Sequence, residues 1–561
     1  MLLRKHEMFW HVLSLLFFIC TLAAGTPYAV KETHVVPSQW SQRGSAPPGH
    51  PIRLHFGLKH NTANEDLEQH LLEVSDPSHP RYGEFFTPSR LNGLLKPTNI
   101  TLQVVQEWLS RSGFNSSRLT YTAAKDWVSL TTTIHTAERL LNTNYSMFEH
   151  EDGTVLFRAP EWSLPVHLHN HIDVIQPTNS FYRLPLQRRG QSLKTVEPLP
   201  PRQAFNTHST VGEVCNSSSM TPLCLSKLYG TFNYKQSATK KNSIGMTNFD
   251  GQCSNISDIK LYMERFQPTF RLVGSGEDSF IPKFVSIAGA VNDQSPITQS
   301  EAAARVDVEG NLDAETILGL TWPLKLEILG TGTATILPPF NPDLSTPTNT
   351  NEPFLEWLLG MKEAGLNLPN IISTSYGDDE QTVPFSYARK VCTQFAALGL
   401  QGISLFFAAG DSGVGEDPYC YANDGTTAAF VPEFPASCPF VTTVGATMGI
   451  NPELLANNPE NGFVGGSGFS NYFPRPKYQK TAVESYLAKI GSTFDGFYNK
   501  SGRAYPDISA QGYRYAIVSV LSFDAALTSY KFLQIDAPPL PCSTSQDQHL
   551  PSAMFQIRTA T

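Results

Sequence analysis

Apolar segments alternate with predicted helices through the middle of this 561-residue chain. Strands are predicted at 243–247, 325–329, 370–375, 404–409 and 440–444, with helices at 257–266, 354–364 and 385–398. Strands that are apolar on both faces and alternate with helices are typical of a parallel sheet covered on both sides. We therefore expect an α/β fold with a mostly parallel sheet from about residue 221 onward.

A separate α+β unit is predicted over residues 31–186. Its expected elements are strands at 52–58, 127–130 and 145–148 and helices at 64–74 and 102–112. The dibasic pair Arg188 and Arg189 and a Pro-rich segment at 197–201 follow it. In a secreted protein such a pair is either a processing site or part of a plain interdomain linker, and the sequence leaves both interpretations open.

The first 24 residues are expected to be a signal peptide. Arg4 and Lys5 form a basic start, residues 9–22 are largely apolar, and residues 22–25 offer small side chains for cleavage. The alternative is a membrane anchor, but the apolar run is short for a spanning helix, and no later stretch is long enough to span a bilayer. We therefore expect an extracellular protein with no membrane partner after signal removal.

Secretion makes the cysteines candidates for disulfides. Cys215 and Cys224 are close enough in sequence to close a small loop. Six glycosylation sequons fit a secreted glycoprotein, at Asn99, Asn115, Asn144, Asn216, Asn255 and Asn499.

Composition and motifs exclude several classes of function. The net charge of -9 argues against a nucleic-acid partner, because nucleic-acid binding needs a concentrated basic surface. The chain has no CxxC and no HExxH motif, so a zinc site is not expected. A charged fraction of only 16% suits a protein that stays soluble in acid.

Glu309 and Asp313 are the first candidate catalytic residues. They are four positions apart, so a helix would place both carboxylates on one face, one turn apart. Like charges at this spacing repel unless the pair shares a proton, which raises one pKa. A carboxylate with a raised pKa is suited to act as a general base. The alternative is a solvated acidic helix face, which Asp307 and Glu315 would extend.

Asp411 is the third candidate, because it follows the apolar strand predicted at 404–409. Ligand sites in open α/β sheets lie at the carboxyl ends of the strands. An aspartic acid kept protonated there would donate a hydrogen bond to an oxyanion. The alternative is a helix N-cap or turn aspartate before Gly413.

Five motifs in order resemble the sedolisins, the serine-carboxyl peptidases that include tripeptidyl-peptidases. They lie at 309–313, 372–377, 409–413, 464–470 and 505–512, and read EGNLD, ISTSYG, AGDSG, VGGSGFS and YPDISAQG. The N-terminal unit resembles the activation prodomain of this family, because the short motifs PRYG at 80–83 and FTP at 86–88 match. The six sequons and the dibasic pair resemble those of the family's secreted fungal tripeptidyl-peptidases.

This resemblance implies a subtilisin-like domain at 206–516, preceded by a prodomain at 33–186 and a linker at 187–205. It implies a Ser-Glu-Asp triad, with Glu309 as general base, Asp313 orienting it, and Asp411 as the oxyanion-hole acid. The implied activity is release of tripeptides from peptide N-termini at acid pH, although endopeptidase action also fits. The implied partners are a peptide substrate and the chain's own prodomain, and the implied cofactor is calcium.

The resemblance ends near residue 516. The family's nucleophile lies in a Gly-Thr-Ser-x-Ser motif downstream of 505–512, but no glycine follows Gly512 in this chain. Asp524, Asp536 and Asp547 show no calcium-loop pattern, so the family's calcium site is also missing. We therefore expect a truncated catalytic domain and an aberrant tail at 517–561. Either this tail is a translation artefact of an active peptidase, or the chain is an inactive homologue that binds peptides or inhibits peptidases.

Overall fold

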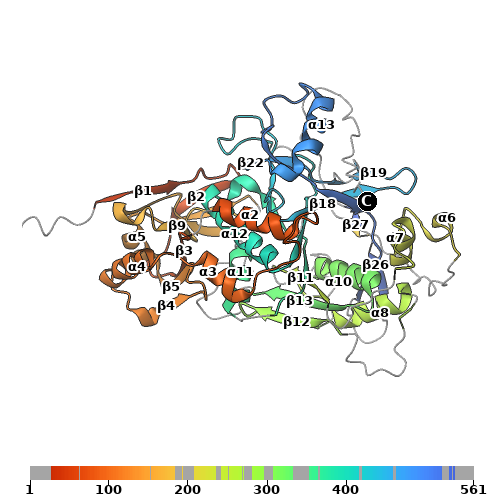
Figure 1. The fold of residues 1–561 in the computed structure, drawn as a ribbon, viewed down its shortest axis with the longest axis horizontal. Helices are drawn as coiled ribbons and strands as arrows, with labels where there is room; N and C mark the ends of the chain where they lie inside the picture. The colour runs from red at the N-terminus through yellow and green to blue at the C-terminus, as the bar shows by residue number, and fades with distance from the viewer. Residues whose placement is uncertain are drawn as a thin grey trace, which may run out of the picture.

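The computed structural model describes residues 27–61, 64–151, 153–182, 192–193, 208–234, 242–249, 252–267, 269–270, 281–295, 307–332, 353–363, 367–415, 420–458, 463–520, 530–533 and 535–536. These residues form an N-terminal α+β unit, red to orange in Figure 1, packed beside an α/β unit coloured yellow to blue. The predicted signal peptide and the dibasic pair lie outside the described residues.

The N-terminal unit is built on antiparallel sheets. One has the strand order β4-β5-β3-β9, another has the order β2-β6-β7, and β1 pairs with β8. Their bounds are Leu119–Tyr121 (β4), Trp127–Thr133 (β5), Pro51–Leu58 (β3), Ile172–Gln176 (β9), Trp40–Ser45 (β2), Ser146–His150 (β6), Val155–Arg158 (β7), Tyr28–Thr33 (β1) and Glu161–Pro165 (β8). Its helices are α2 (Asn64–Ser75), α3 (Pro88–Leu95), α4 (Asn99–Arg111) and α5 (Ile134–Leu141). The predicted strands and helices of this unit are confirmed.

Strand β3 is buried on both of its faces. Leu54, Phe56 and Leu58 are fully buried in the core of the N-terminal unit. The alternating residue His55 instead contacts Glu356 of the α/β unit. The four-stranded sheet is therefore covered by its own helices on one side and by the neighbouring unit on the other.

The α/β unit contains the predicted, mostly parallel sheet. The strand order is β12-β13-β11-β14-β16-β18, with β24 parallel and β19 antiparallel to β18. The bounds are Lys283–Ile287 (β12), Lys325–Thr331 (β13), Ser243–Asn248 (β11), Ile371–Thr374 (β14), Ser404–Ala408 (β16), Thr442–Met448 (β18), Ile508–Gln511 (β24) and Leu454–Leu455 (β19). The sequence did not predict β12 and β24, because β12 is short with exposed Lys283 and Ser286, and β24 is short and half-exposed.

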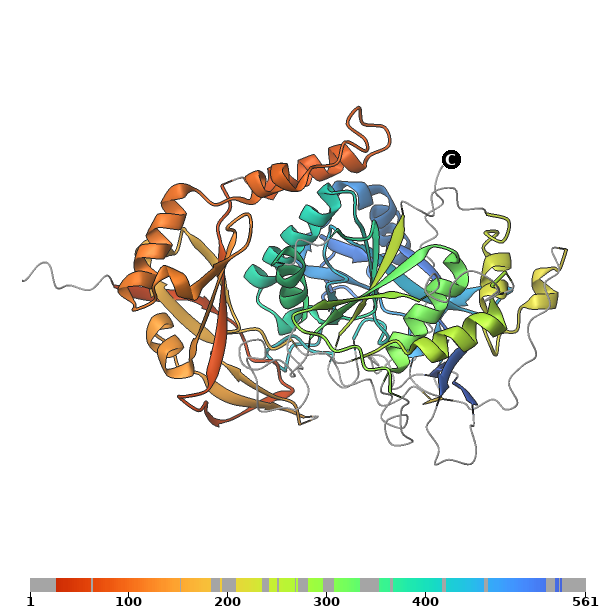
Figure 2. The same ribbon diagram turned by 90° about the horizontal axis from the view of Figure 1, so that it is seen from below.

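Helices cover both faces of this sheet, as Figure 2 shows. Helices α8 (Ile256–Phe266) and α10 (Val308–Thr321) pack on one face, and α11 (Pro353–Glu363) and α12 (Phe385–Leu400) pack on the other. Strand β25 (Ile517–Val520) lies against α8 and α10, with Ile517 and Val518 buried. The packed domain thus continues four residues beyond the predicted boundary at 516.

Disulfides join Cys215 to Cys224, as predicted, and Cys392 to Cys438. The second bond ties α12 to the segment before β18. Within the residues described above, no helix has the length and apolarity needed to cross a membrane.

Candidate active site

The start of helix α10 is fixed against the loop that carries Cys253. Asp307 precedes the helix in a left-handed conformation with φ 64°, and its Oδ1 accepts a 2.7 Å hydrogen bond from the backbone N of Cys253. A Cβ on Gly310 would lie 2.3 Å from the backbone oxygen of Cys253. The helix and the loop are therefore so close that only a residue without a Cβ fits at this position. These contacts set the direction in which the first turns of α10 point.

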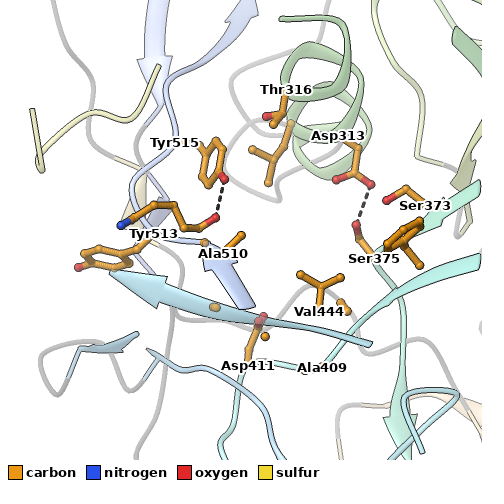
Figure 3. Close-up of a pocket in the computed structure, with 18 of the residues that line it drawn as sticks. Asp313, Thr316, Ser373, Ser375, Ala409, Asp411, Val444, Ala510, Tyr513 and Tyr515 are labelled. Atoms are coloured by element: carbon orange, nitrogen blue, oxygen red, sulfur yellow. Dashed lines mark hydrogen bonds between the residues drawn. The ribbon is translucent and has the colours of Figure 1, made fainter. Parts of the chain in front are cut away.

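Glu309 and Asp313 lie on this helix and line one cavity of about 380 Å³. The hydroxyl Oγ of Ser375 donates a 2.8 Å hydrogen bond to Oδ2 of Asp313 (Figure 3). Burial raises the pKa of Asp313 to about 6, although the Ser375 hydrogen bond opposes the shift. Burial, followed by the nearby Asp313 and Asp411, raises the pKa of Glu309 well above its ordinary value.

The acidic stretch around these residues is not a solvated helix face. Asp307 is 6% exposed and Glu315 is 0% exposed. One Glu315 carboxylate oxygen accepts a 2.8 Å hydrogen bond from the backbone N of Val518 in β25. Asp307 therefore holds the start of α10 and Glu315 holds its middle in place, and the alternative of a solvent-facing acidic surface is wrong.

Asp411 lies across the cavity from α10, just beyond the carboxyl end of β16 (Figure 3). Gly410 has φ 92°, and a Cβ there would lie 1.9 Å from a Glu433 carboxylate oxygen. The backbone oxygen of Asp411 accepts a 3.0 Å hydrogen bond from Val464. Residues 411–415 form a bend and a turn, so Asp411 does not cap a helix.

Ser375 is a site residue whose role the sequence did not reveal. It appeared only as part of the ISTSYG motif at 372–377, without an assigned role. Its position directly after β14 is the same signal that singled out Asp411, since both follow apolar strands of one parallel sheet. The remaining wall of the cavity includes Ser373, Val444, Phe463, Tyr513 and Tyr515.

The chain was compared with known proteins. Residues 38–181 match the family model described as Pro-kumamolisin, activation domain. Probable tripeptidyl-peptidase SED2 of Arthroderma benhamiae is 34% identical over 519 residues, covering 90% of this chain and 82% of the relative. Probable tripeptidyl-peptidase SED3 of the same fungus is 34% identical over 520 residues, covering 91% of this chain and 81% of the relative.

The chain belongs to the sedolisin family of serine-carboxyl peptidases. The N-terminal α+β unit contains the family's activation domain, and we call this unit the prodomain from here on. Among solved structures, a Pseudomonas sedolisin, a serine-carboxyl proteinase, is similar with a TM-score of 0.36 at 18% identity, covering 54% of this chain and 74% of that one.

Two parts of a sedolisin site were predicted to be missing from this chain. The serines that line the described cavity are Ser373 and Ser375, and neither belongs to a Gly-Thr-Ser-x-Ser motif. Across the described ranges, no three His, Cys, Asp or Glu side chains gather as metal ligands. Calcium therefore stays an expectation from the family resemblance, and no step below is routed through it.

Proposed function

We propose that this sedolisin-family chain derives from a secreted peptidase that acts at acid pH and releases tripeptides from the N-termini of peptides. The observation that carries the proposal is the shared cavity, in which the Glu309–Asp313 pair faces Asp411 across a space of about 380 Å³. The relatives named tripeptidyl-peptidase support the substrate class. The proposal includes a signal peptide at 1–24 and maturation within the linker at 187–205.

In this proposal Glu309 is the general base. A general base works best when its pKa is near the working pH, and burial beside Asp313 and Asp411 raises the pKa of Glu309. Asp313 holds the Glu309 carboxyl in place and is itself held by the Ser375 hydroxyl. An acid optimum follows, since carboxyl groups take the role that histidine has in neutral serine peptidases.

Asp411 is proposed as the oxyanion-hole acid. Its position after β16 directs the carboxyl into the cavity that would hold the scissile carbonyl. A protonated carboxyl donates a hydrogen bond to the developing negative charge, and such a donor contributes about 3 kcal/mol to lowering the barrier. The proposed mechanism therefore needs Asp411 protonated while Glu309 is ionised, and these two requirements bound the working pH from above and from below.

The missing motif favours a second candidate function. Acyl transfer needs an attacking oxygen, and the chain as written has no glycine after Gly512 and hence no Gly-Thr-Ser-x-Ser nucleophile. Without the nucleophile, the other catalytic groups retain only residual rate enhancement. The alternative is therefore an inactive homologue that uses the cavity to bind peptides or to inhibit peptidases.

One experiment separates the two functions. The protein produced from its own gene, so that the natural transcript supplies the tail, is incubated with a ten-residue peptide between pH 3 and pH 7, and the products and the bound peptide are measured by mass spectrometry and calorimetry. The peptidase proposal expects tripeptide release that is lost in Glu309→Gln and kept in Glu315→Gln, a buried acid of the same helix outside the cavity. Hydrolysis that is unchanged in Glu309→Gln would refute the assignment of the base.

The inactive alternative expects no hydrolysis by the wild-type chain, together with peptide binding that Asp411→Asn weakens. Sequencing of the spliced transcript across the codons for 512–523 complements the assay. A transcript that encodes Gly-Thr-Ser-x-Ser there would identify the tail as an artefact of an active peptidase.

A further inference from the structure

The prodomain and the α/β unit share an interface with an apolar rim and a polar centre. Trp127 and Val174 of the prodomain join the apolar cluster of α11 and α12. Leu67 and Val74 of α2 pack against α12 at the other side, where α2 lies beside that helix in Figure 2. Buried charged groups lie between these apolar contacts.

Lys390 of α12 is the central charge. Its side chain is 4% exposed, and its ammonium group is bound by prodomain atoms. Nζ donates to the backbone oxygen of Leu58, to Oδ2 of Asp173 at 3.3 Å, and to Nε2 of His60 at 3.1 Å. An ammonium group has three protons to donate and no lone pair, so each of these partners accepts a hydrogen bond.

The contact with Lys390 fixes the protonation state of His60. Because Nε2 of His60 accepts from the ammonium, the imidazole is neutral and carries its proton on Nδ1. Protonation would place a second N–H on Nε2, which abolishes the acceptor and leaves two cations 3.1 Å apart. Burial, followed by the charge of Lys390, lowers the pKa of His60, as this geometry requires.

The neighbouring carboxylates are already occupied by other donors. Asp126 Oδ2 is 3.8 Å from His60 Nε2, but it also contacts Lys362 at 3.4 Å and accepts from Gln394 at 3.0 Å. Burial alone would raise the pKa of Asp126, but Lys362 and the hydrogen bonds to its carboxylate outweigh burial and lower the pKa. Asp126 therefore stays ionised in acid. The charged groups that face His60 or its partners are Lys390 on α12, Lys362 on α11, Asp126 before β5, Asp173 on β9 and Lys31 on β1.

We propose that the His60–Lys390 contact is a proton-sensitive latch that weakens the attachment of the prodomain to the α/β unit in acid. The pKa of His60 is lower in the folded protein than its ordinary value. The neutral side chain therefore stabilises docking of the prodomain above the ordinary histidine pKa, and this stabilisation is lost as the pH falls through the pKa of the folded state. The biological meaning of the latch rests on the proposed function, because a prodomain that loosens in acid would uncover a peptidase where it works.

His55 provides a matched control, because it is a second buried histidine at this interface with a different partner. It is also buried at this interface, where Nδ1 contacts Ser129 Oγ at 2.8 Å and Nε2 contacts Glu356 Oε1 at 2.9 Å. Its partner across the interface is a carboxylate rather than an ammonium. Among the described residues, His55 therefore has no contact with a cation that protonation could break.

Hydrogen–deuterium exchange on the full-length chain tests the latch without requiring peptidase activity. Exchange of the 51–60 and 385–400 peptides is measured between pH 3.5 and pH 7.5 and corrected for intrinsic rates, with the buried strand at 404–408 as internal reference. We expect the wild-type interface peptides to lose protection in acid. We expect His60→Gln, whose amide oxygen still accepts from Lys390 but does not titrate, to shift that loss by about one pH unit toward acid.

His55→Gln is expected to reduce interface protection without moving its midpoint toward acid. In Lys390→Met the cation is absent but burial still lowers the pKa of His60, so adding His60→Gln should shift the midpoint by less than it does beside Lys390. An unchanged midpoint in His60→Gln, or an equal acid shift in His55→Gln, would overturn the proposal. Because this readout is independent of hydrolysis, a chain without peptidase activity still tests the latch.

Discussion

The hydroxyl of Ser375 donates a 2.8 Å hydrogen bond to Asp313, and this bond joins strand β14 to helix α10 across 62 residues of sequence. Ser375 follows the last residue of the strand, while Asp313 lies within the second turn of the helix. The bond favours the ionised form of Asp313 and opposes the effect of burial. It therefore affects the pH range in which the carboxylate pair can share a proton.

Replacing Ser375 by alanine should raise the pKa of Asp313. The expected change is about one pH unit, because a hydrogen bond to a charged group contributes roughly 1.5 kcal/mol. The measurement is the pH dependence of tripeptide release or, if the chain is inactive, of peptide binding. Ser375→Thr keeps the hydroxyl and serves as control. Identical profiles for Ser375→Ala and the wild type would show that the bond does not influence the pair.

Glu315→Gln should stabilise the protein at neutral pH. Burial and the nearby Asp258 raise the pKa of Glu315, and the hydrogen bond from Val518 opposes this shift. The protonated side chain therefore stabilises the fold in acid, and this stabilisation is lost as the pH rises through the pKa of the folded state. Glutamine can still accept from Val518 and carries no charge. We expect a gain of about 1–2 kcal/mol in the free energy of unfolding at pH 7 and little change at pH 4.

Thermal unfolding at the two pH values measures this effect. Glu107→Gln on the exposed surface of α4 is the control, since an exposed carboxylate contributes little. A gain for Glu315→Gln that is equal at pH 4 and pH 7 would show that the charge is not its cause.

Gly310→Ala should destabilise the α/β unit. The added Cβ would lie 2.3 Å from the backbone oxygen of Cys253, and relieving this clash moves the start of α10. Overpacking of this kind costs about 1–3 kcal/mol. Gly93→Ala in α3 is the matched control, because no atom lies within 4 Å of the added Cβ and alanine favours the helix by roughly 1 kcal/mol. Chemical denaturation of both variants checks the opposite signs.

Asn255 should carry no glycan, although it lies in a sequon. Its side chain is 6% exposed, and its oxygen caps α8 by accepting hydrogen bonds from Ser257 and Asp258. Asn99 and Asn144 are exposed and leave room for a glycan. Peptide mass spectrometry after enzymatic deglycosylation in ¹⁸O water would detect occupancy in protein recovered from the culture medium, and a glycan on Asn255 would contradict the packing described above.

The sequence by itself determined the fold class and two parts of the site. The apolar strands predicted the parallel sheet, because burial on both faces leaves a continuous apolar pattern. The four-residue spacing placed Glu309 and Asp313 on one helix face, and the position of Asp411 after an apolar strand placed it at the ligand-binding edge. The predicted positions agree with the structure because each depends on a short segment with its own periodicity, while the catalytic roles stay predictions.

Only the tertiary structure decided which residues meet across long separations in sequence. It buried Asp307 and Glu315, which the sequence also allowed on a solvated surface. It brought Lys390 to His60, 330 residues away, and so made one interface histidine sensitive to acid. No local pattern records these contacts, because they arise from the packing of complete sheets and helices against one another, and that packing sets both the burial and the charged neighbours of each group.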